Sequence, residues 1–98
     1  MTIEILPRAR EDLVGGFHFY EQQEQGLGRY FRESLFADIE SLRTTAGVHR
    51  RVLGYHRLVS KTFPYAIYYA VSGDAAQVHA IFDCRSDPSS LRGRLREV

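Results

Sequence analysis

Cysteine is nearly absent from this sequence, since Cys84 is the only one among 98 residues. No disulfide can form within the chain, and a metal site built from several thiolates is excluded. A single cysteine agrees with a protein that resides in a reducing compartment. We therefore expect a cytoplasmic protein, and we expect it to need no cofactor.

Long hydrophobic runs are also missing. No apolar segment approaches the roughly 20 residues that a membrane-spanning helix needs. The first residues, Met1 to Glu4, lack the basic and then apolar pattern of a signal peptide. The sequence thus predicts no membrane segment and no membrane partner.

A large excess of charge is missing as well, because 13 basic and 12 acidic residues leave a net charge of +1. Proteins that bind nucleic acid by general attraction to phosphate are usually far more basic. The charge is uneven, however, since Arg92, Arg94 and Arg96 stand near the carboxyl end against Glu97 alone. We expect these arginines to form either a solvated face or a contact to nucleic acid held by a target enzyme.

The composition that remains is that of an ordinary globular chain, with 44% hydrophobic and 26% charged residues. A chain of this length buries enough apolar surface for one core only. We therefore expect residues 1–98 to form a single domain.

Helical periodicity dominates the first half of the chain. A short β-type run at residues 2–6 is followed by Pro7, which is tolerated in the first turn of a helix. Apolar residues at helical spacing predict a helix from there to about residue 25 and a second helix that ends at Gly47. Two antiparallel helices joined by a tight turn should result.

Two consecutive glycines, Gly15 and Gly16, fall inside the first predicted helix. Each costs about 1 kcal/mol relative to alanine at such a position. Packing of the helix must offset this cost, or a close crossing with the second helix must require the glycines.

The period changes from about 3.6 to 2 in the second half, which indicates strands. Three strands are predicted, at residues 55–61, 65–71 and 77–84. Asp87 and Pro88 can begin a last short helix as its cap and first turn. The expected fold is therefore α+β, with the order β-α-α-β-β-β and a helical hairpin packed on an antiparallel sheet.

Four short segments of the sequence form a recognisable set in this order and spacing. They are residues 7–13 with 19–21 (PRAREDL and FYE), residues 54–58 (GYHRL), residues 63–69 (FPYAIYY) and residues 83–88 (DCRSDP). Together they resemble the RelE/ParE superfamily, the toxins of bacterial type II toxin–antitoxin modules of plasmid-stabilisation type. The resemblance covers nearly the whole chain. It implies the fold predicted above and a hetero-oligomer with a cognate antitoxin protein.

The two branches of this superfamily make different demands on the residues. RelE-like members cleave messenger RNA on the ribosome, which requires proton transfer and cations beside the phosphate. ParE-like members are associated with poisoning of DNA gyrase. The position that usually carries an arginine early in the middle strand is Tyr65, and the late tyrosine or histidine position falls near Leu91. This incomplete catalytic set favours the ParE-like branch.

Arg57 and Arg85 match arginines that the superfamily carries in the first and last strands of its meander. Each guanidinium can bind a phosphate or carboxylate of a partner. Each can equally form an internal bridge, for example to Asp83 or Asp87. Tyr65 belongs to a tyrosine cluster that either contacts a partner or fills the core.

The histidines His49, His56 and His79 are suited to acid–base chemistry near neutral pH. We favour the interpretation that they are ordinary strand and loop residues. Their spacing does not indicate convergence on a metal ion, so no metal site is expected. If the protein were a nuclease, His56, His79 and Lys61 would be the catalytic candidates.

Our leading hypothesis is a ParE-like toxin that blocks growth by binding DNA gyrase. The residues predicted to contact the target or the antitoxin are Arg57, Tyr65, Arg85, Arg92 and Arg94. The alternatives are a ribosome-dependent endonuclease that acts on mRNA, and a non-toxic member that only binds its antitoxin. A small domain with 12% aromatic residues should also leave apolar surface on the hairpin or sheet. We expect the antitoxin to cover it as a helix along a groove.

Overall fold

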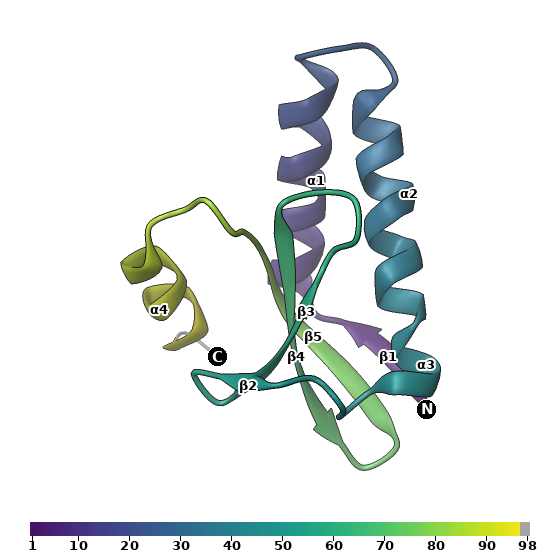
Figure 1. Ribbon diagram of the computed structural model, residues 1–98, viewed down its shortest axis with the longest axis vertical. Coiled ribbons are helices and arrows are strands. Elements are labelled where there is room, and N and C mark those ends of the chain that lie inside the picture. The colour runs from purple at the N-terminus through teal and green to yellow at the C-terminus, as the bar shows by residue number, and fades with distance from the viewer. Residues whose placement is uncertain (97–98) are drawn as a thin grey trace.

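A five-stranded sheet forms the centre of the computed structural model, which describes residues 1–96 (Figure 1). The strand order is β1-β5-β4-β3-β2. The strands are β1 (Thr2–Ile5), β2 (Arg51–Val52), β3 (Tyr55–Val59), β4 (Tyr65–Ser72) and β5 (Ala75–Asp83). Strands β2 to β5 form an antiparallel meander, and β1 pairs with β5 in parallel. The predicted meander is confirmed, and β1 adds a parallel strand at one edge.

Helices cover both faces of the sheet. One face packs against α1 (Pro7–Glu21), α2 (Leu27–Glu40) and the short α3 (Leu42–Thr45), and the other packs against α4 (Pro88–Arg96). The predicted α+β fold, with its helical hairpin and its last short helix, is confirmed. None of the helices within residues 1–96 is long and apolar enough to cross a membrane.

The turn of the hairpin begins earlier than predicted, because α1 ends at Glu21 rather than near residue 25. The Glu21 carboxylate accepts hydrogen bonds from the backbone amides of Gly26 and Gly28 at 3.0 to 3.1 Å. These amides lie at the start of α2, where backbone donors lack helical partners. Gly26 has a φ of 90°, the left-handed conformation expected of a glycine at this turn.

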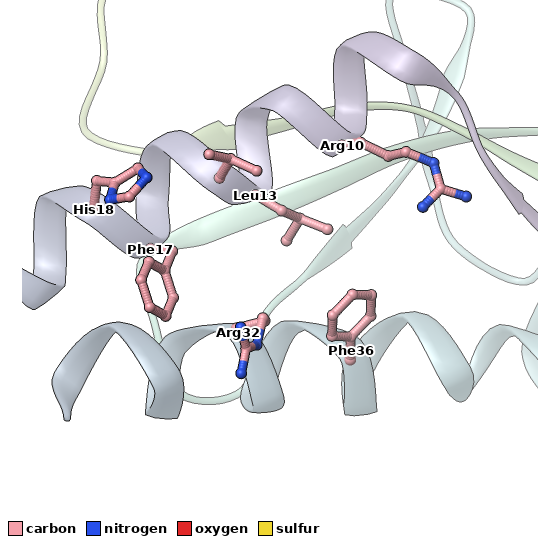
Figure 2. A pocket seen from close by; sticks show the side chains of 7 residues that line it. Arg10, Leu13, Phe17, His18, Arg32 and Phe36 are labelled. Atoms are coloured by element: carbon pink, nitrogen blue, oxygen red, sulfur yellow. The ribbon is translucent and has the colours of Figure 1, made fainter.

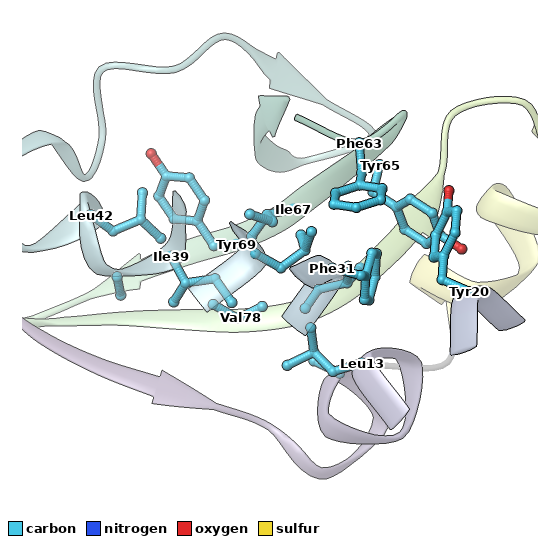
Figure 3. Close-up of a cluster of buried hydrophobic side chains, with 14 residues drawn as sticks. Leu13, Tyr20, Phe31, Ile39, Leu42, Phe63, Tyr65, Ile67, Tyr69 and Val78 are labelled. Atoms are coloured by element: carbon cyan, nitrogen blue, oxygen red, sulfur yellow. The ribbon is translucent and has the colours of Figure 1, made fainter. Parts of the chain in front are cut away.

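The main core lies between the hairpin and the sheet and is rich in aromatic rings (Figure 3). The Phe31 ring is fully buried, and its centroid lies 4.9 to 5.2 Å from those of Tyr20, Phe63 and Tyr65. On the opposite face of the sheet, Tyr68 belongs to a smaller core beneath α4, together with Leu95. The middle strand, β4, is therefore apolar on both of its faces.

A β-bulge interrupts the pairing of β4 with β5. Tyr68 pairs with Ala80, whereas the next residue, Tyr69, pairs with Val78, so His79 is the extra residue. Its ring faces Tyr55, at a centroid distance of 4.9 Å. The side-chain Nδ1 of His79 is buried and has no hydrogen-bond partner among the residues that the structure describes.

The edge of β5 is open beyond residue 78, because β1 pairs only with residues 75–78. The Asp12 carboxylate of α1 accepts the Ile81 amide at 2.9 Å and both terminal nitrogens of Arg94 at 2.6 and 2.7 Å. Arg94 also donates to the His79 carbonyl at 3.4 Å. The interpretation of Arg94 as part of an exposed contact face is wrong, since its side chain is 9% exposed and forms this ion pair.

The β3–β4 loop begins earlier than predicted, since β3 ends at Val59 rather than residue 61. The Ser60 hydroxyl donates to the buried Asp38 carboxylate at 2.7 Å. The same hydroxyl oxygen accepts from the amides of Thr62 and Phe63 at 3.3 and 3.4 Å. These bonds fix the loop against α2 and replace the sheet bonds that a longer strand would form.

Strand β2 was not predicted from the sequence. It pairs with β3 through a two-residue turn at Leu53 and Gly54, whose φ angles are 54° and 86°. Such a turn favours asparagine followed by glycine, because both residues are left-handed. Leucine in this conformation costs about 1 to 2 kcal/mol, and Leu53 is 49% exposed. A two-residue strand followed by Leu-Gly gives almost no sequence signal.

The two glycines of α1 allow a matched stability test. A Cβ at Gly16 would lie 2.5 Å from the Phe31 ring, whereas a Cβ at Gly15 would meet nothing within 4 Å. We expect Gly16→Ala to lower the free energy of unfolding by about 1 to 3 kcal/mol through overpacking. We expect Gly15→Ala to raise it by about 0.5 to 1 kcal/mol through helix propensity. Urea unfolding of both variants measures this, and equal effects of the two would contradict the helix crossing described here.

Candidate functional site

A groove with an apolar floor and a basic rim lies between α1 and α2 (Figure 2). Its volume is about 320 Å³. The apolar lining residues are Leu13, Val14, Phe17 and Phe36, and the basic ones are Arg10, His18 and Arg32. The Arg32 guanidinium lies over the Phe17 ring, 5.2 Å from its centroid, which is favourable cation–π geometry. Within residues 1–96, no acidic side chain lines this groove.

The sequence predicted uncovered apolar surface on the hairpin or sheet but did not name these residues. Val14 is 55% exposed, although it follows the buried Leu13. Phe36 is likewise exposed next to the buried Leu35. An exposed apolar residue one position after a core residue broadens the apolar stripe of its helix. This broadening is the signal by which the groove could have been found.

Arg57 and Arg85, the two arginines that match the superfamily, are not brought together. Arg57 donates to the Tyr68 hydroxyl at 3.2 Å and to Cys84 Sγ at 3.5 Å, on the face that packs against α4. Arg85 donates to the Asp83 carboxylate at 2.8 to 2.9 Å and to the Tyr20 hydroxyl of α1 at 3.5 Å. Their tyrosine partners therefore lie on opposite faces of the sheet, and the two guanidinium groups do not form one anion site.

Both arginines already have internal partners, which raise the pKa of each guanidinium. For Arg57 the main cause is its hydrogen bond to Tyr68, and for Arg85 it is the hydrogen bond to Asp83. The same contact with Arg85 lowers the pKa of the Asp83 carboxyl. The predicted internal bridge to Asp83 is present. Because the Arg85 side chain is 58% exposed, it also remains accessible to a partner.

Tyr65 lies in the aromatic core and is 8% exposed. Burial is the main cause that raises the pKa of its phenol to about 12, and Tyr20 and Asp83 add to it. The phenol is therefore neutral at physiological pH. Its ring stabilises the fold and is not available as a broad surface for a partner.

Arg92, another of the predicted contact residues, lies on α4 and is exposed. It lines a cavity of about 220 Å³ together with Leu53, Leu95 and Arg96. A second cavity of about 260 Å³ lies between the sheet and α4, and its lining includes Arg50, Arg57 and Tyr68. Arginines therefore lie beside α4 in both cavities, and Asp83 also lines the second one.

The catalytic candidates of the nuclease alternative occupy three separate places. His56 stacks on Tyr69 of the hairpin-side core at a centroid distance of 5.1 Å. His79 contacts Tyr55 of the opposite core. Lys61 lines a shallow cavity beside Asp38 in the β3–β4 loop. Within residues 1–96, no three side chains of the histidine, cysteine, aspartate or glutamate type are grouped so that they could hold a metal ion.

His49 and Tyr69 form a hydrogen bond beside the main core. The Gly47 amide donates to the Tyr69 hydroxyl oxygen at 2.9 Å, and the same hydroxyl hydrogen-bonds to His49 Nδ1. Nδ1 of His56 donates to the His49 carbonyl at 2.7 Å. Burial, and then the neighbouring His56, lower the pKa of His49. Burial also lowers the pKa of His79.

Comparison with known proteins gives similarity in structure rather than in sequence. No family model matches the chain, and no curated protein matches it. Among solved structures, the chain is similar to a chain of the chromosomal ParDE TA system from P. aeruginosa, with a TM-score of 0.77 and 17% identity. The alignment covers 85% of this chain and 95% of that one. At this identity the similarity establishes a shared fold.

Two partly buried histidines, His49 and His79, predict how stability depends on pH. Their pKa values are lower in the folded state than the value of about 6.5 in the unfolded chain. The unfolded state therefore binds more protons below pH 6.5, and stability is lost as the pH falls from 6.5 through the folded values. The pKa values of Asp83 and Asp87 are also lowered, but these carboxyl groups change the stability only below about pH 4.

We expect the free energy of unfolding to be lower at pH 5.5 than at pH 7.5, as measured by urea denaturation. In the double variant His49→Gln/His79→Gln, the free energy of unfolding should differ much less between the two pH values. Each single variant then shows how much of the difference its histidine contributes. An unchanged difference in the double variant would assign the titration to other groups.

Proposed function

We propose that this chain is the toxin of a type II toxin–antitoxin module. The observation that supports this most is the fold, which it shares with a chain of the ParDE TA system along most of its length. The four sequence segments that resemble the RelE/ParE superfamily lie on α1, on β3, on the β3–β4 loop with β4, and at the end of β5. Fold and segments support the same assignment independently.

The cognate antitoxin is the partner that we propose for the groove between α1 and α2. The floor offers Val14, Phe17 and Phe36 to apolar side chains, and the rim offers Arg10 and Arg32 to carboxylates. This pattern suits an amphipathic helix with acidic residues along its polar edge. The complex would be a hetero-oligomer in which the antitoxin covers surface that the toxin leaves exposed.

DNA gyrase is the target that we propose, in keeping with the ParE-like branch. A protein that inhibits by binding needs surface complementarity and no catalytic group. The arrangement of the chain agrees with this, because Arg57 and Arg85 serve opposite faces of the sheet. His56, His79 and Lys61 are likewise separated. The residues that cleavage of mRNA on the ribosome would need are therefore not assembled at one site.

The antitoxin contact is tested with two valine variants. Val14 lines the groove, whereas Val48 is 75% exposed in the turn before β2. Val14→Asp should weaken the complex with the product of the adjacent reading frame about tenfold or more, because it places a carboxylate on the apolar floor opposite an acidic partner. Val48→Asp should leave affinity unchanged. Calorimetry on the co-expressed partners measures both, and equal affinities would exclude this groove as the antitoxin site.

The target is tested with Arg85→Ala. We expect this variant to lose growth inhibition and inhibition of gyrase supercoiling, while its free energy of unfolding changes little, because an exposed ion pair contributes little to stability. Arg43→Ala, which removes an exposed arginine paired with Glu40 on the hairpin side, is the control. Codon-specific decay of ribosome-bound messages with supercoiling intact would instead establish the nuclease function.

A further inference from the structure

The arginines of this nearly neutral chain are concentrated at one end of the molecule. Residues 50–57 and 88–96 contain six of the 13 basic residues and none of the 12 acidic ones. These two segments are the β2–β3 hairpin and α4, which lie next to one another (Figure 1). Of the six, Arg94 is neutralised by Asp12, and the other five remain beside the two cavities or on the hairpin. Asp83 lines one of these cavities and Asp87 immediately precedes α4, so basic residues outnumber acidic ones at this end although the net charge of the chain is only +1.

Leu53 lies within this basic region and lines one of its cavities together with Arg92, Leu95 and Arg96. It occupies the tip of the β2–β3 turn in the left-handed conformation, and about half of its surface is exposed. The turn is braced by Arg51, whose guanidinium donates to the Gly54 carbonyl at 3.0 Å. An exposed leucine in a strained conformation does not stabilise the domain, and strain of this kind is concentrated at functional sites.

We propose that this end of the molecule binds duplex DNA directly, with Leu53 inserted against the base stack in the minor groove and the arginines on phosphates. The residues of the contact are Arg50, Arg51, Leu53, Arg92 and Arg96. Proteins that bend DNA from the minor groove commonly combine an apolar wedge with flanking arginines. β-Ribbons are used in the minor groove by proteins that bend the duplex as they bind.

Duplex DNA fits this surface better than single-stranded RNA. Recognition of single strands depends on exposed aromatic rings that stack on bases. The rings nearest to the tip, Tyr55 and Phe82, pack instead against the core beneath α4. This contact goes beyond the proposed function, because it is a property of the chain without antitoxin or gyrase. If gyrase is the target, the same contact would act on the DNA that the enzyme holds.

Fluorescence anisotropy with a labelled 20-base-pair duplex tests the contact on the full chain alone. We expect Kd to increase with salt concentration. The slope of log Kd against log salt concentration should correspond to three to four phosphate contacts, each of which contributes about 0.9. Arg92→Gln/Arg96→Gln should reduce that slope by about 2 and weaken binding tenfold or more at low salt. Arg29→Gln/Arg43→Gln removes the same charge from α2 and α3 and should change neither the slope nor the affinity.

The wedge is tested with Leu53→Asn, because asparagine tolerates the left-handed conformation. This variant should keep the salt slope and show an equal or higher melting temperature, but it should lose the DNA bending that end-to-end energy transfer measures on the duplex. Three results would each overturn the proposal: tighter binding to single-stranded RNA of the same length, full bending by Leu53→Asn, and equal loss of affinity in both arginine double variants. Inhibition of gyrase and capture of antitoxin are measured separately, so their failure would leave this result standing.

Discussion

The arrangement of the whole domain depends on how the open edge of β5 is closed. A sheet edge with free amides and carbonyls is a site for unwanted pairing, and β5 has such an edge where β1 ends. Asp12 accepts the Ile81 amide there, and Arg94 donates to the His79 carbonyl. A partly buried ion pair repays its desolvation only when its remaining hydrogen bonds are satisfied. This pair meets that condition because the strand edge supplies the additional partners.

The same pair determines where α4 lies and therefore what the two faces of the sheet can do. Arg94 extends from α4 to α1 across the edge, which holds Leu95 against Tyr68 and Ala80 in the smaller core. The exposed side of α4 then presents Arg92 and Arg96 beside the β2–β3 turn. On the other face, the hairpin keeps its groove between α1 and α2 open. One apolar surface with a basic rim and one arginine-rich surface thus occupy different parts of the molecule.

The sequence was sufficient for the order of the helices and the three long strands, because each has a clear period and a glycine or proline at its end. It was not sufficient where a residue type departs from its usual place. Leu53 occupies a turn position that usually carries asparagine, which concealed β2. Arg94 is buried, although its spacing matches that of the exposed arginines on either side. The partners of Arg85 and Tyr65 depend on contacts between distant segments, which no local pattern contains.

The parallel pairing of β1 with β5 also constrains the order in which the chain can fold during synthesis. The bond between Gln77 and Glu4 joins residues 73 positions apart, and Asp12 and Arg94 are separated by 82 positions. Contacts of this separation form late, since loop closure must be completed before they contribute. The hairpin of α1 and α2 is local and can form while the later strands are still being translated. A nascent chain therefore exposes the ring of Phe31 until β4 and β5 arrive, and the last turn of α4 must emerge before the edge of the sheet is closed.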